Sequence, residues 1–212
     1  MHESGLKVGV VLLAAGKGSR MGDVPKCLLA LDGVALIRRH LAAMTEAGID
    51  DLVIVTGHYH EQIEPAISGS TARLIRNPDP EEGQQSSVRI GLEALGTGLD
   101  LAVVALADQP LVGSAELHEL LAAFRRRPAG TQIVYPAVGG QRGNPVAFAG
   151  EIVAAMLASG AGRKFIDTHP ELVHVYETGN EAFILDLDTR EDLAALQKRA
   201  GVTLTLPPSV QS

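Results

Sequence analysis

Near its N-terminus the chain reads Val8-Gly-Val-Val-Leu-Leu-Ala-Ala-Gly-Lys-Gly-Ser-Arg-Met-Gly22, an apolar run followed by a loop rich in glycine and basic side chains. The apolar half, up to Leu13, predicts a strand buried in a sheet. The loop can present several backbone N–H groups to a phosphate, because glycine lets the backbone approach an anion closely. Lys17 and Arg20, with Lys26 a little further along, would offset the charge of that anion. The segment therefore predicts a phosphate-binding loop at the end of a buried strand.

Two familiar phosphate-binding motifs do not fit this loop. The dinucleotide fingerprint has glycine at its first, third and sixth positions, and here the sixth position is Met21. A P-loop has Gly-Lys followed by Ser or Thr, but Gly16-Lys17 is followed by Gly18. The spacing thus argues against a nicotinamide oxidoreductase. The alternative to a third kind of phosphate loop is an ordinary strand-to-helix turn with solvated basic residues.

Composition narrows the class of partner. A chain of 212 residues with 46% hydrophobic residues suits one α/β domain with a sizeable core. Aromatic residues make up only 3% and the net charge is −7, which disfavours binding to nucleic acid or to an anionic membrane. The basic loop is a local exception and favours a small anionic ligand. Because the N-terminus lacks the pattern of a signal peptide and the first apolar run is too short to span a membrane, we expect a cytoplasmic protein.

Apolar runs alternate along the chain with amphipathic segments. Strands are expected at Lys7–Leu13, Asp51–Thr56, Ala72–Arg76, Leu99–Ala107, Gln132–Tyr135 and Ala182–Leu185. Helices are expected at Val34–Ala47, His58–Ile67, Ser86–Leu95, Ser114–Arg126 and from about Thr189 onward. This alternation predicts a mostly parallel sheet with helices on both faces. We expect one domain over residues 1–200 and a loose C-terminal tail over residues 201–212.

Polar clusters follow three of the expected strands. They are the glycine-rich loop, Asn77-Pro78 and Asp108-Gln109-Pro110. Because ligands bind at the carboxyl ends of the strands in open α/β sheets, we expect the three clusters to meet at one edge. Asp108, at the end of a buried strand, is placed to bind Mg²⁺, which takes one or two carboxylates plus substrate phosphates. The alternative role for Asp108 is that of a turn or helix-capping residue.

A second acidic segment, Asp186-Leu187-Asp188-Thr189, precedes the last expected helix. Its carboxylates are candidates for the same metal site. Asp188 or Thr189 could instead simply cap that helix.

The segment Leu13–Gly22 and the lysine that follows resemble the signature L-A-A-G-x-G/S-x-R-M-G, then Lys, of the MobA/MocA-like nucleotidyltransferase family. Within that family the sequence resembles the molybdenum cofactor cytidylyltransferases and the related guanylyltransferases, over roughly Leu6 to Leu196. The resemblance implies a Rossmann-like three-layer α/β/α nucleotidyltransferase fold. It also implies Mg²⁺-dependent transfer of CMP from CTP to a phosphorylated acceptor, molybdopterin, with release of pyrophosphate. A molybdenum hydroxylase or its chaperone is the protein partner that would accompany this activity.

The resemblance also implies roles for the residues that match the family's motifs. The catalytic set is Arg20, Lys26 and Asp108. The metal ligands are Asp108 and Asp188, with Asp186 as the alternate for the second. The nucleotide-binding set is Leu13, Ala14, Ala15, Gly16, Gly18, Ser19, Arg20, Lys26, Asn77, Ser86 and Ser87. The acceptor-binding set is Arg142, Gly143, Asn144 and Arg163.

Some segments differ from the family pattern. Gln84 stands where methionine is usual in the segment G-M-x-x-S-L-x-x-G-L, and Ser159-Gly160-Ala161 lacks the aspartate of G-D-x-G-A-R. The segment Gly139–Phe148, which resembles R-G-x-P of the acceptor site, could be a glycine-rich β-hairpin. The serine pair favours CTP, yet three alternatives stay open. They are a guanylyltransferase, a methylerythritol-phosphate or sugar-phosphate nucleotidyltransferase, and a non-catalytic nucleotide-binding module.

Overall fold

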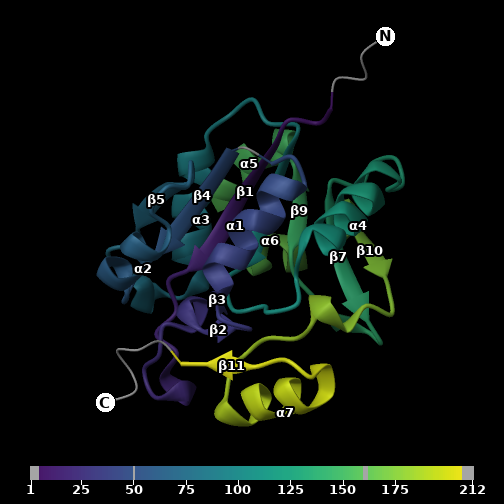
Figure 1. Ribbon diagram of the computed structural model, residues 1–212. Helices are drawn as coiled ribbons and strands as arrows, with labels where there is room; N and C mark the ends of the chain where they lie inside the picture. Colours follow the sequence, from purple (N-terminus) through teal and green to yellow (C-terminus); the bar gives the residue numbers. More distant parts are fainter. Residues whose placement is uncertain (1–4, 50, 160–161, 207–212) are drawn as a thin grey trace.

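The computed structural model describes residues 5–49, 51–159 and 162–206 (Figure 1). Within these residues the main sheet has eight strands, in the order β10-β7-β9-β6-β1-β4-β5, with β8 paired to β7. The strands are β1 (Val8–Ala14), β4 (Asp51–Thr56), β5 (Arg73–Arg76), β6 (Leu101–Leu106), β7 (Ile133–Val138), β8 (Gln141–Arg142), β9 (Val146–Ala149) and β10 (Val173–Glu177). All pairs are parallel except those of β8 and β9, which confirms a mostly parallel sheet.

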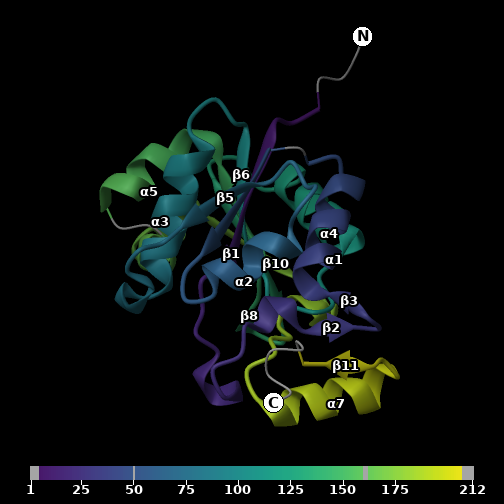
Figure 2. The same cartoon turned by 60° about the vertical axis from the view of Figure 1, so that its left-hand side comes forward.

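Helices cover both faces of this sheet, as a buried parallel sheet requires. One face carries α1 (Leu36–Glu46), α2 (His60–Ala66) and α4 (Ser114–Arg125), and the other carries α3 (Gln84–Leu95), α5 (Val153–Ser159) and α6 (Arg163–Thr168). Figure 2 shows α1 and α4 on one side of the strands and α3 and α5 on the other. The alternation in β1 explains both layers, because Val10 and Leu12 pack in one core cluster while Val11 and Leu13 pack in the other. The expected three-layer α/β/α architecture is confirmed.

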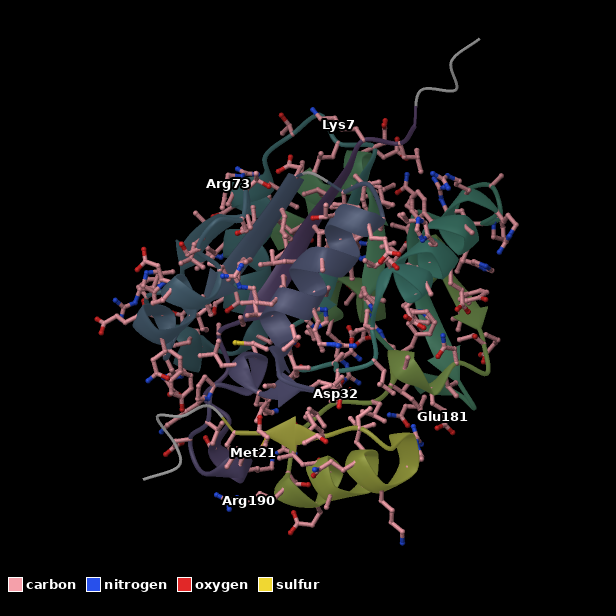
Figure 3. All side chains as sticks on the ribbon, viewed as in Figure 1. Lys7, Met21, Asp32, Arg73, Glu181 and Arg190 are labelled. Carbon is pink, nitrogen blue, oxygen red and sulfur yellow. The ribbon has the colours of Figure 1, made fainter. Side chains whose placement is uncertain are left out.

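A small second sheet lies beside the main one. It consists of β2 (Ala30–Leu31), β3 (Val34–Ala35) and β11 (Leu204–Thr205), and α7 (Arg190–Ala200) precedes β11 (Figure 1). A third apolar cluster joins these elements to the glycine-rich loop. Its buried members are Met21, Val24, Leu29, Leu31, Leu36, Leu187, Leu196 and Leu204. Figure 3 shows Met21, in the glycine-rich loop, close to the C-terminal segment, so residues 21–36 and 187–204 share one core.

The expectation of a loose tail from residue 201 is wrong for Leu204 and Thr205. Both pair with β2 in antiparallel register, and Leu204 is buried in the third apolar cluster. The apolar burial of Leu204 and the pairing of the strand fix this part of the segment. The end of the expected tail, residues 207–212, lies outside the described residues.

Two other expected elements take a different form. Ala182–Leu185 was expected as a strand, but its first residues lie in a 3-10 turn at Glu181–Phe183, which Asn180 caps. The carbonyl of Phe183 accepts hydrogen bonds from the side chain of Gln109 and the backbone N–H of Asn144, so it is not available to a neighbouring strand. The start of the expected helix at Val34 pairs as β3. The other 3-10 turns are Ser19–Met21, Lys26–Leu28, Pro80–Glu82, Gly150–Ile152 and Pro170–Leu172. In the described part of the chain, no helix combines the length and apolar character needed to cross a bilayer.

His40 on α1 gives the fold a pH dependence that can be measured. Burial, with the nearby charge of Arg39, lowers the pKa of His40 from 6.5 to about 4. Because the unfolded chain takes up this proton first as the pH falls, stability is lost from about pH 6.5 down to about pH 4. We expect the free energy of unfolding to fall about 2 kcal/mol more in the wild type than in His40→Gln between about pH 7.5 and about pH 5.

Urea unfolding at several pH values measures this difference. His118→Gln removes an exposed histidine from α4 and is the matched control, with the wild-type slope expected. Equal slopes for wild type and His40→Gln would mean that His40 is not a buried neutral group.

Candidate active site

The three polar clusters meet at the carboxyl ends of β1, β5 and β6, as expected. A cavity of about 220 Å³, here called the first cavity, lies at this edge and is lined by the glycine-rich loop, by Asp108 and by residues that follow Asn77-Pro78. Its lining residues are Leu13, Ala14, Ala15, Gly16, Gly18, Pro25, Lys26, Cys27, Pro80, Gly83, Gln84, Ser87, Leu106, Ala107 and Asp108. The lining residues that were absent from the expected site are Pro25, Cys27, Pro80, Gly83, Gln84, Leu106 and Ala107. A ligand of this cavity would contact segments from three different strand ends.

The glycine-rich loop is held in one shape from several sides. Gly18 has a φ of +66°, and a Cβ there would collide with the Val24 carbonyl oxygen, so only glycine fits. The hydroxyl of Tyr59, which follows β4, donates to the Lys17 carbonyl at 2.8 Å. Burial of Met21 in the third apolar cluster fixes the far side of the loop. The backbone that lines the cavity is therefore positioned before any ligand binds.

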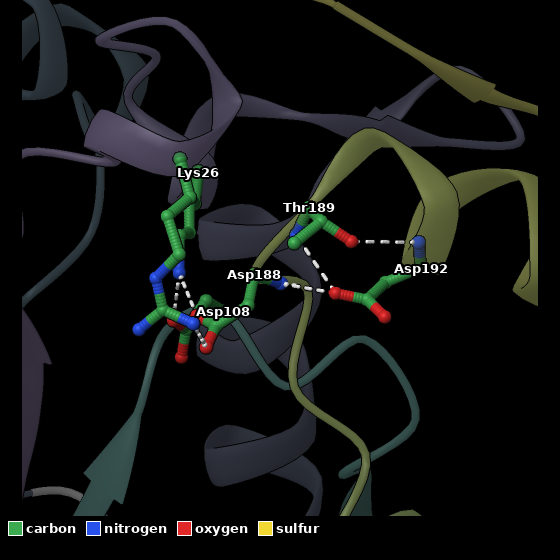
Figure 4. A network of polar contacts seen from close by, with 6 residues as sticks. Lys26, Asp108, Asp188, Thr189 and Asp192 are labelled. Carbon is green, nitrogen blue, oxygen red and sulfur yellow. Dashed lines mark hydrogen bonds and ion pairs between the residues drawn. The ribbon is translucent and has the colours of Figure 1, made fainter.

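A charged network lies beside this loop (Figure 4). Lys26 Nζ donates to Asp108 Oδ2 at 3.1 Å and to Asp188 Oδ1 at 2.5 Å. Arg20 donates to the other oxygen of Asp188 at 2.7 Å. Burial lowers the pKa of Lys26, but the charges and hydrogen bonds of the two aspartates outweigh this effect and raise it overall. The network brings together the three residues expected to be catalytic and both expected metal ligands.

The start of α7 fixes the backbone of Asp188. The Thr189 hydroxyl accepts from Asp192 N, and Asp192 Oδ2 accepts from the backbone N–H groups of both Thr189 and Asp188 (Figure 4). Thr189 is therefore the helix cap, and the carboxylate of Asp188 is free to face Lys26. The hydrogen bond from Lys26, assisted by the charge of Arg20 and opposed by partial burial, lowers the pKa of Asp188. Asp188 stays ionised in this arrangement.

Asp186 has a different environment. Partial desolvation of its carboxyl and the negative charge of Asp108 raise its pKa to about 6, although much of the residue is solvent-accessible. The ion pairs of Lys26 and Arg20 run to Asp108 and Asp188 instead.

The two carboxylates fit a compact divalent cation. A single ammonium reaches both Asp108 and Asp188, so their oxygens converge on one cationic position. No group of three or more His, Cys, Asp or Glu side chains suited to hold a metal occurs in the described part of the chain. Two carboxylates suit Mg²⁺ when substrate phosphates and water complete the shell.

Asn77 and Ser86 lie behind the wall of the first cavity, and of the expected polar side chains on this segment only Ser87 lines it. Asn77 is 2% exposed, and its amide nitrogen donates to Ser86 Oγ at 2.8 Å and to Ser87 Oγ at 2.9 Å. The expected direct contacts of Asn77 and Ser86 with a ligand are therefore replaced by contacts with each other. A sequence pattern cannot tell which way a buried amide turns.

A second cavity of about 360 Å³ adjoins the first and shares Leu13, Gln84 and Leu106 with it. All four expected acceptor-binding residues line it, namely Arg142, Gly143, Asn144 and Arg163. The alternative reading of this segment also holds, because Arg142 lies in a hairpin formed by β7 and β8. The hairpin presents these residues to the cavity. Gly160 and Ala161 of the neighbouring segment lie outside the described residues.

Ser19 and Arg20 complete the account of the expected site, and Cys27 is a neighbour that was not expected in it. Ser19 and Arg20 do not line the first cavity, and Arg20 pairs with Asp188, which in turn pairs with the lining residue Lys26. Cys27 borders the cavity but is buried, and burial with the charge of Asp108 raises the pKa of its thiol to about 12. The thiol stays protonated and is not an activated nucleophile.

A fixed glycine-rich loop, two convergent carboxylates and two adjoining cavities at the strand ends define an α/β protein built to hold a phosphate-bearing ligand beside a second ligand. Residues 10–173 match the model of the MobA-like NTP transferase domain, and the chain belongs to that family. The family resemblance of the sequence is thus confirmed.

Several known proteins are similar to the chain. A nicotine blue oxidoreductase from Paenarthrobacter nicotinovorans is 31% identical, over 88% of this chain and 94% of that protein. The bifunctional protein GlmU from Syntrophomonas wolfei is 33% identical over 58% of this chain, which covers only 27% of GlmU. A nucleotidyl transferase from Methanothermobacter has 26% identity and a TM-score of 0.74, over 92% of this chain and 97% of that one.

A fourth similarity concerns the fold alone. The 4-diphosphocytidyl-2C-methyl-D-erythritol synthase of Anaerococcus prevotii is 16% identical, with a TM-score of 0.73 over 92% of this chain and 96% of that one.

The charged network predicts how a metal binds without nucleotide. The ammonium of Lys26 competes with a divalent cation for the oxygens of Asp108 and Asp188. Lys26→Met should therefore bind Mn²⁺ about tenfold more tightly than the wild type, because it removes a like charge at contact distance. Electron paramagnetic resonance of free Mn²⁺ gives the affinity in nucleotide-free buffer.

Lys17→Met is the matched control, since Lys17 is in the same loop but lies near Asp23 instead. Equal Mn²⁺ affinity in wild type, Lys26→Met and Lys17→Met would contradict the assignment of one cation position to both carboxylates.

Proposed function

We propose that the chain is a Mg²⁺-dependent nucleotidyltransferase that transfers CMP from CTP to a phosphorylated acceptor, with molybdopterin as the favoured acceptor, and releases pyrophosphate. The observation that carries this proposal is the network of Lys26, Asp108, Asp188 and Arg20 beside the glycine-rich loop. It combines cations for phosphates with carboxylates for a metal at one edge of the sheet. Membership of the family supports the reaction class.

The proposed chemistry needs no covalent enzyme intermediate. A phosphate oxygen of the acceptor attacks the α-phosphorus of the triphosphate, and pyrophosphate leaves. Both reactants are polyanions, so the barrier depends on charge neutralisation and alignment. Mg²⁺, held by Asp108 and Asp188, would neutralise phosphate charge. The protonated thiol of Cys27 agrees with a mechanism without an enzyme nucleophile.

Each reactant would have its own cavity. Backbone N–H groups from Gly16 to Gly18 would hold the triphosphate in the first cavity, where Lys26 would contact developing charge. Arg142 and Arg163 would bind the anionic acceptor in the second cavity, together with Gly143 and Asn144. Because the cavities share wall residues, the acceptor phosphate could reach the α-phosphorus. Molybdopterin, and a molybdenum hydroxylase or its chaperone as protein partner, rest on the family resemblance.

One comparison favours a second candidate function. The nicotine blue oxidoreductase aligns with nearly the full length of this chain, so a redox reaction on an organic dye is the alternative. The glycine spacing of the loop argues against a dinucleotide fingerprint. Oxidation of NADH or NADPH by nicotine blue in the presence of the protein measures this alternative directly.

Removal of the carboxylate at Asp108 tests the proposed metal role. Asp108→Asn should lower the rate of pyrophosphate release from CTP and molybdopterin by about a hundredfold and raise the half-saturating Mg²⁺ concentration, because one charged ligand is lost. Asp51→Asn, which alters an exposed ion pair with Arg73, is the matched control. A wild-type Mg²⁺ titration curve for Asp108→Asn would assign Asp108 to the turn alone.

Base choice is a separate prediction. The first cavity is small and the hydroxyl of Ser87 lines it, so CTP should bind more tightly than GTP, ATP or UTP in Mg²⁺. Competition binding with the four triphosphates measures the order. Tighter binding of GTP would replace the cytidylyl assignment by a guanylyl one. A protein that binds no triphosphate but oxidises NADH with nicotine blue would replace the transferase proposal itself.

A further inference from the structure

The side chain of Asn77 has a fixed hydrogen-bond direction. Its Oδ1 accepts from the backbone N–H of Asp79 at 3.0 Å, which identifies the oxygen end of the amide. The nitrogen end therefore faces the helix and donates both of its hydrogens, one to Ser86 and one to Ser87. At 2% exposure, Asn77 has no room to turn over without losing these bonds.

The two serines use their hydroxyl protons differently. Ser86 donates its hydroxyl proton to the Gly83 carbonyl at 2.8 Å, so the hydroxyl of Ser86 both donates to and accepts from protein groups. Ser87 accepts from Asn77, and no described residue accepts the proton of its hydroxyl. Ser87 lines the first cavity, whereas Ser86 does not. One lone pair of Ser87 Oγ is occupied by Asn77, so its hydroxyl proton remains available to a ligand in the cavity that Ser87 lines.

We propose that Asn77 is a positioning residue that fixes Ser87 as a hydrogen-bond donor, so that the site recognises an acceptor atom on the nucleobase. Asn77 acts on the ligand only through Ser87. The inference rests on the proposed function, because it takes the ligand of the first cavity to be a nucleoside triphosphate. Cytosine offers such acceptors at its ring nitrogen N3 and its carbonyl oxygen O2.

Two substitutions separate this role from a structural one. Ser87→Ala removes the donor and should weaken CTP binding about tenfold, the usual effect of leaving a base acceptor unpaired in a closed site. Asn77→Asp keeps the shape of the side chain but replaces the donating nitrogen by an acceptor oxygen. The hydroxyl of Ser87 then turns its proton toward residue 77 and presents a lone pair to the base, so CTP binding should weaken by at least the same factor.

The double variant Ser87→Ala with Asn77→Asp provides the decisive comparison. If Asn77 acts through Ser87, Asn77→Asp has no further effect on CTP affinity once Ser87 is alanine. If Asn77 had only a structural role, Asn77→Asp would weaken CTP binding by the same factor whether position 87 is serine or alanine. Asn77→Ala takes the place of Asn77→Asp if the latter melts below the assay temperature, and the same non-additivity is expected.

Isothermal titration calorimetry with CTP and with inorganic tripolyphosphate, both in Mg²⁺, supplies the measurements. Tripolyphosphate occupies only the phosphate loop, so its affinity should change less than about twofold in every variant. Gln85→Ala, an exposed neighbour on α3, is the matched control and should keep the wild-type affinity for both ligands.

The outcomes distinguish the inference from the function on which it rests. Unchanged CTP affinity in Ser87→Ala, or additive losses in the double variant, overturns the role of Asn77 and leaves nucleotidyl transfer standing. A wild-type protein that binds neither CTP nor tripolyphosphate overturns both.

Discussion

The ammonium of Lys26, held between the carboxylates of Asp108 and Asp188, joins three distant parts of the chain. Lys26 belongs to the loop after β1, Asp108 follows β6 in the middle of the sequence, and Asp188 precedes α7 near the C-terminus. Two carboxylates this close repel each other unless a cation lies between them. The small sheet and α7 position the carboxylate of Asp188 against that of Asp108. Without the ammonium, or a metal in its place, the C-terminal segment would carry an uncompensated charge into the site.

Apolar packing offsets the free-energy cost of partly burying these charges. Leu187, beside Asp188, is fully buried in the third apolar cluster, and its backbone N–H donates to the Asp108 carbonyl at 3.2 Å. Met21 and Val24 bring the glycine-rich loop into the same cluster. Burying a large apolar side chain yields about 2 kcal/mol, comparable to the cost of partly desolvating a paired charge. Apolar neighbours in the third apolar cluster therefore hold the charged residues in position.

The sequence predicts those features whose cause is local. The buried strand β1, the glycine-rich loop and the helix cap at Thr189 each depend on adjacent residues, and the structure has all three. The expectation of a loose tail fails at Leu204 and Thr205 because they pair with β2, far away in the chain. The strand expected at Ala182–Leu185 was wrong because the carbonyl of Phe183 is engaged by Gln109 and Asn144. Asn77 was expected near the ligand, but the orientation of its amide depends on the backbone of Asp79, which no residue pattern records.

The wall common to the two cavities, formed by Leu13, Gln84 and Leu106, has a consequence for how the site can change over evolutionary time. Any shift of these side chains that accommodates one ligand also reshapes the chamber of the other. Thermodynamic reciprocity then requires each ligand to alter the affinity of its neighbour by the same factor. A substitution in this wall therefore changes the shape of both cavities at the same step, so the selectivity of one cavity is not altered independently of the other.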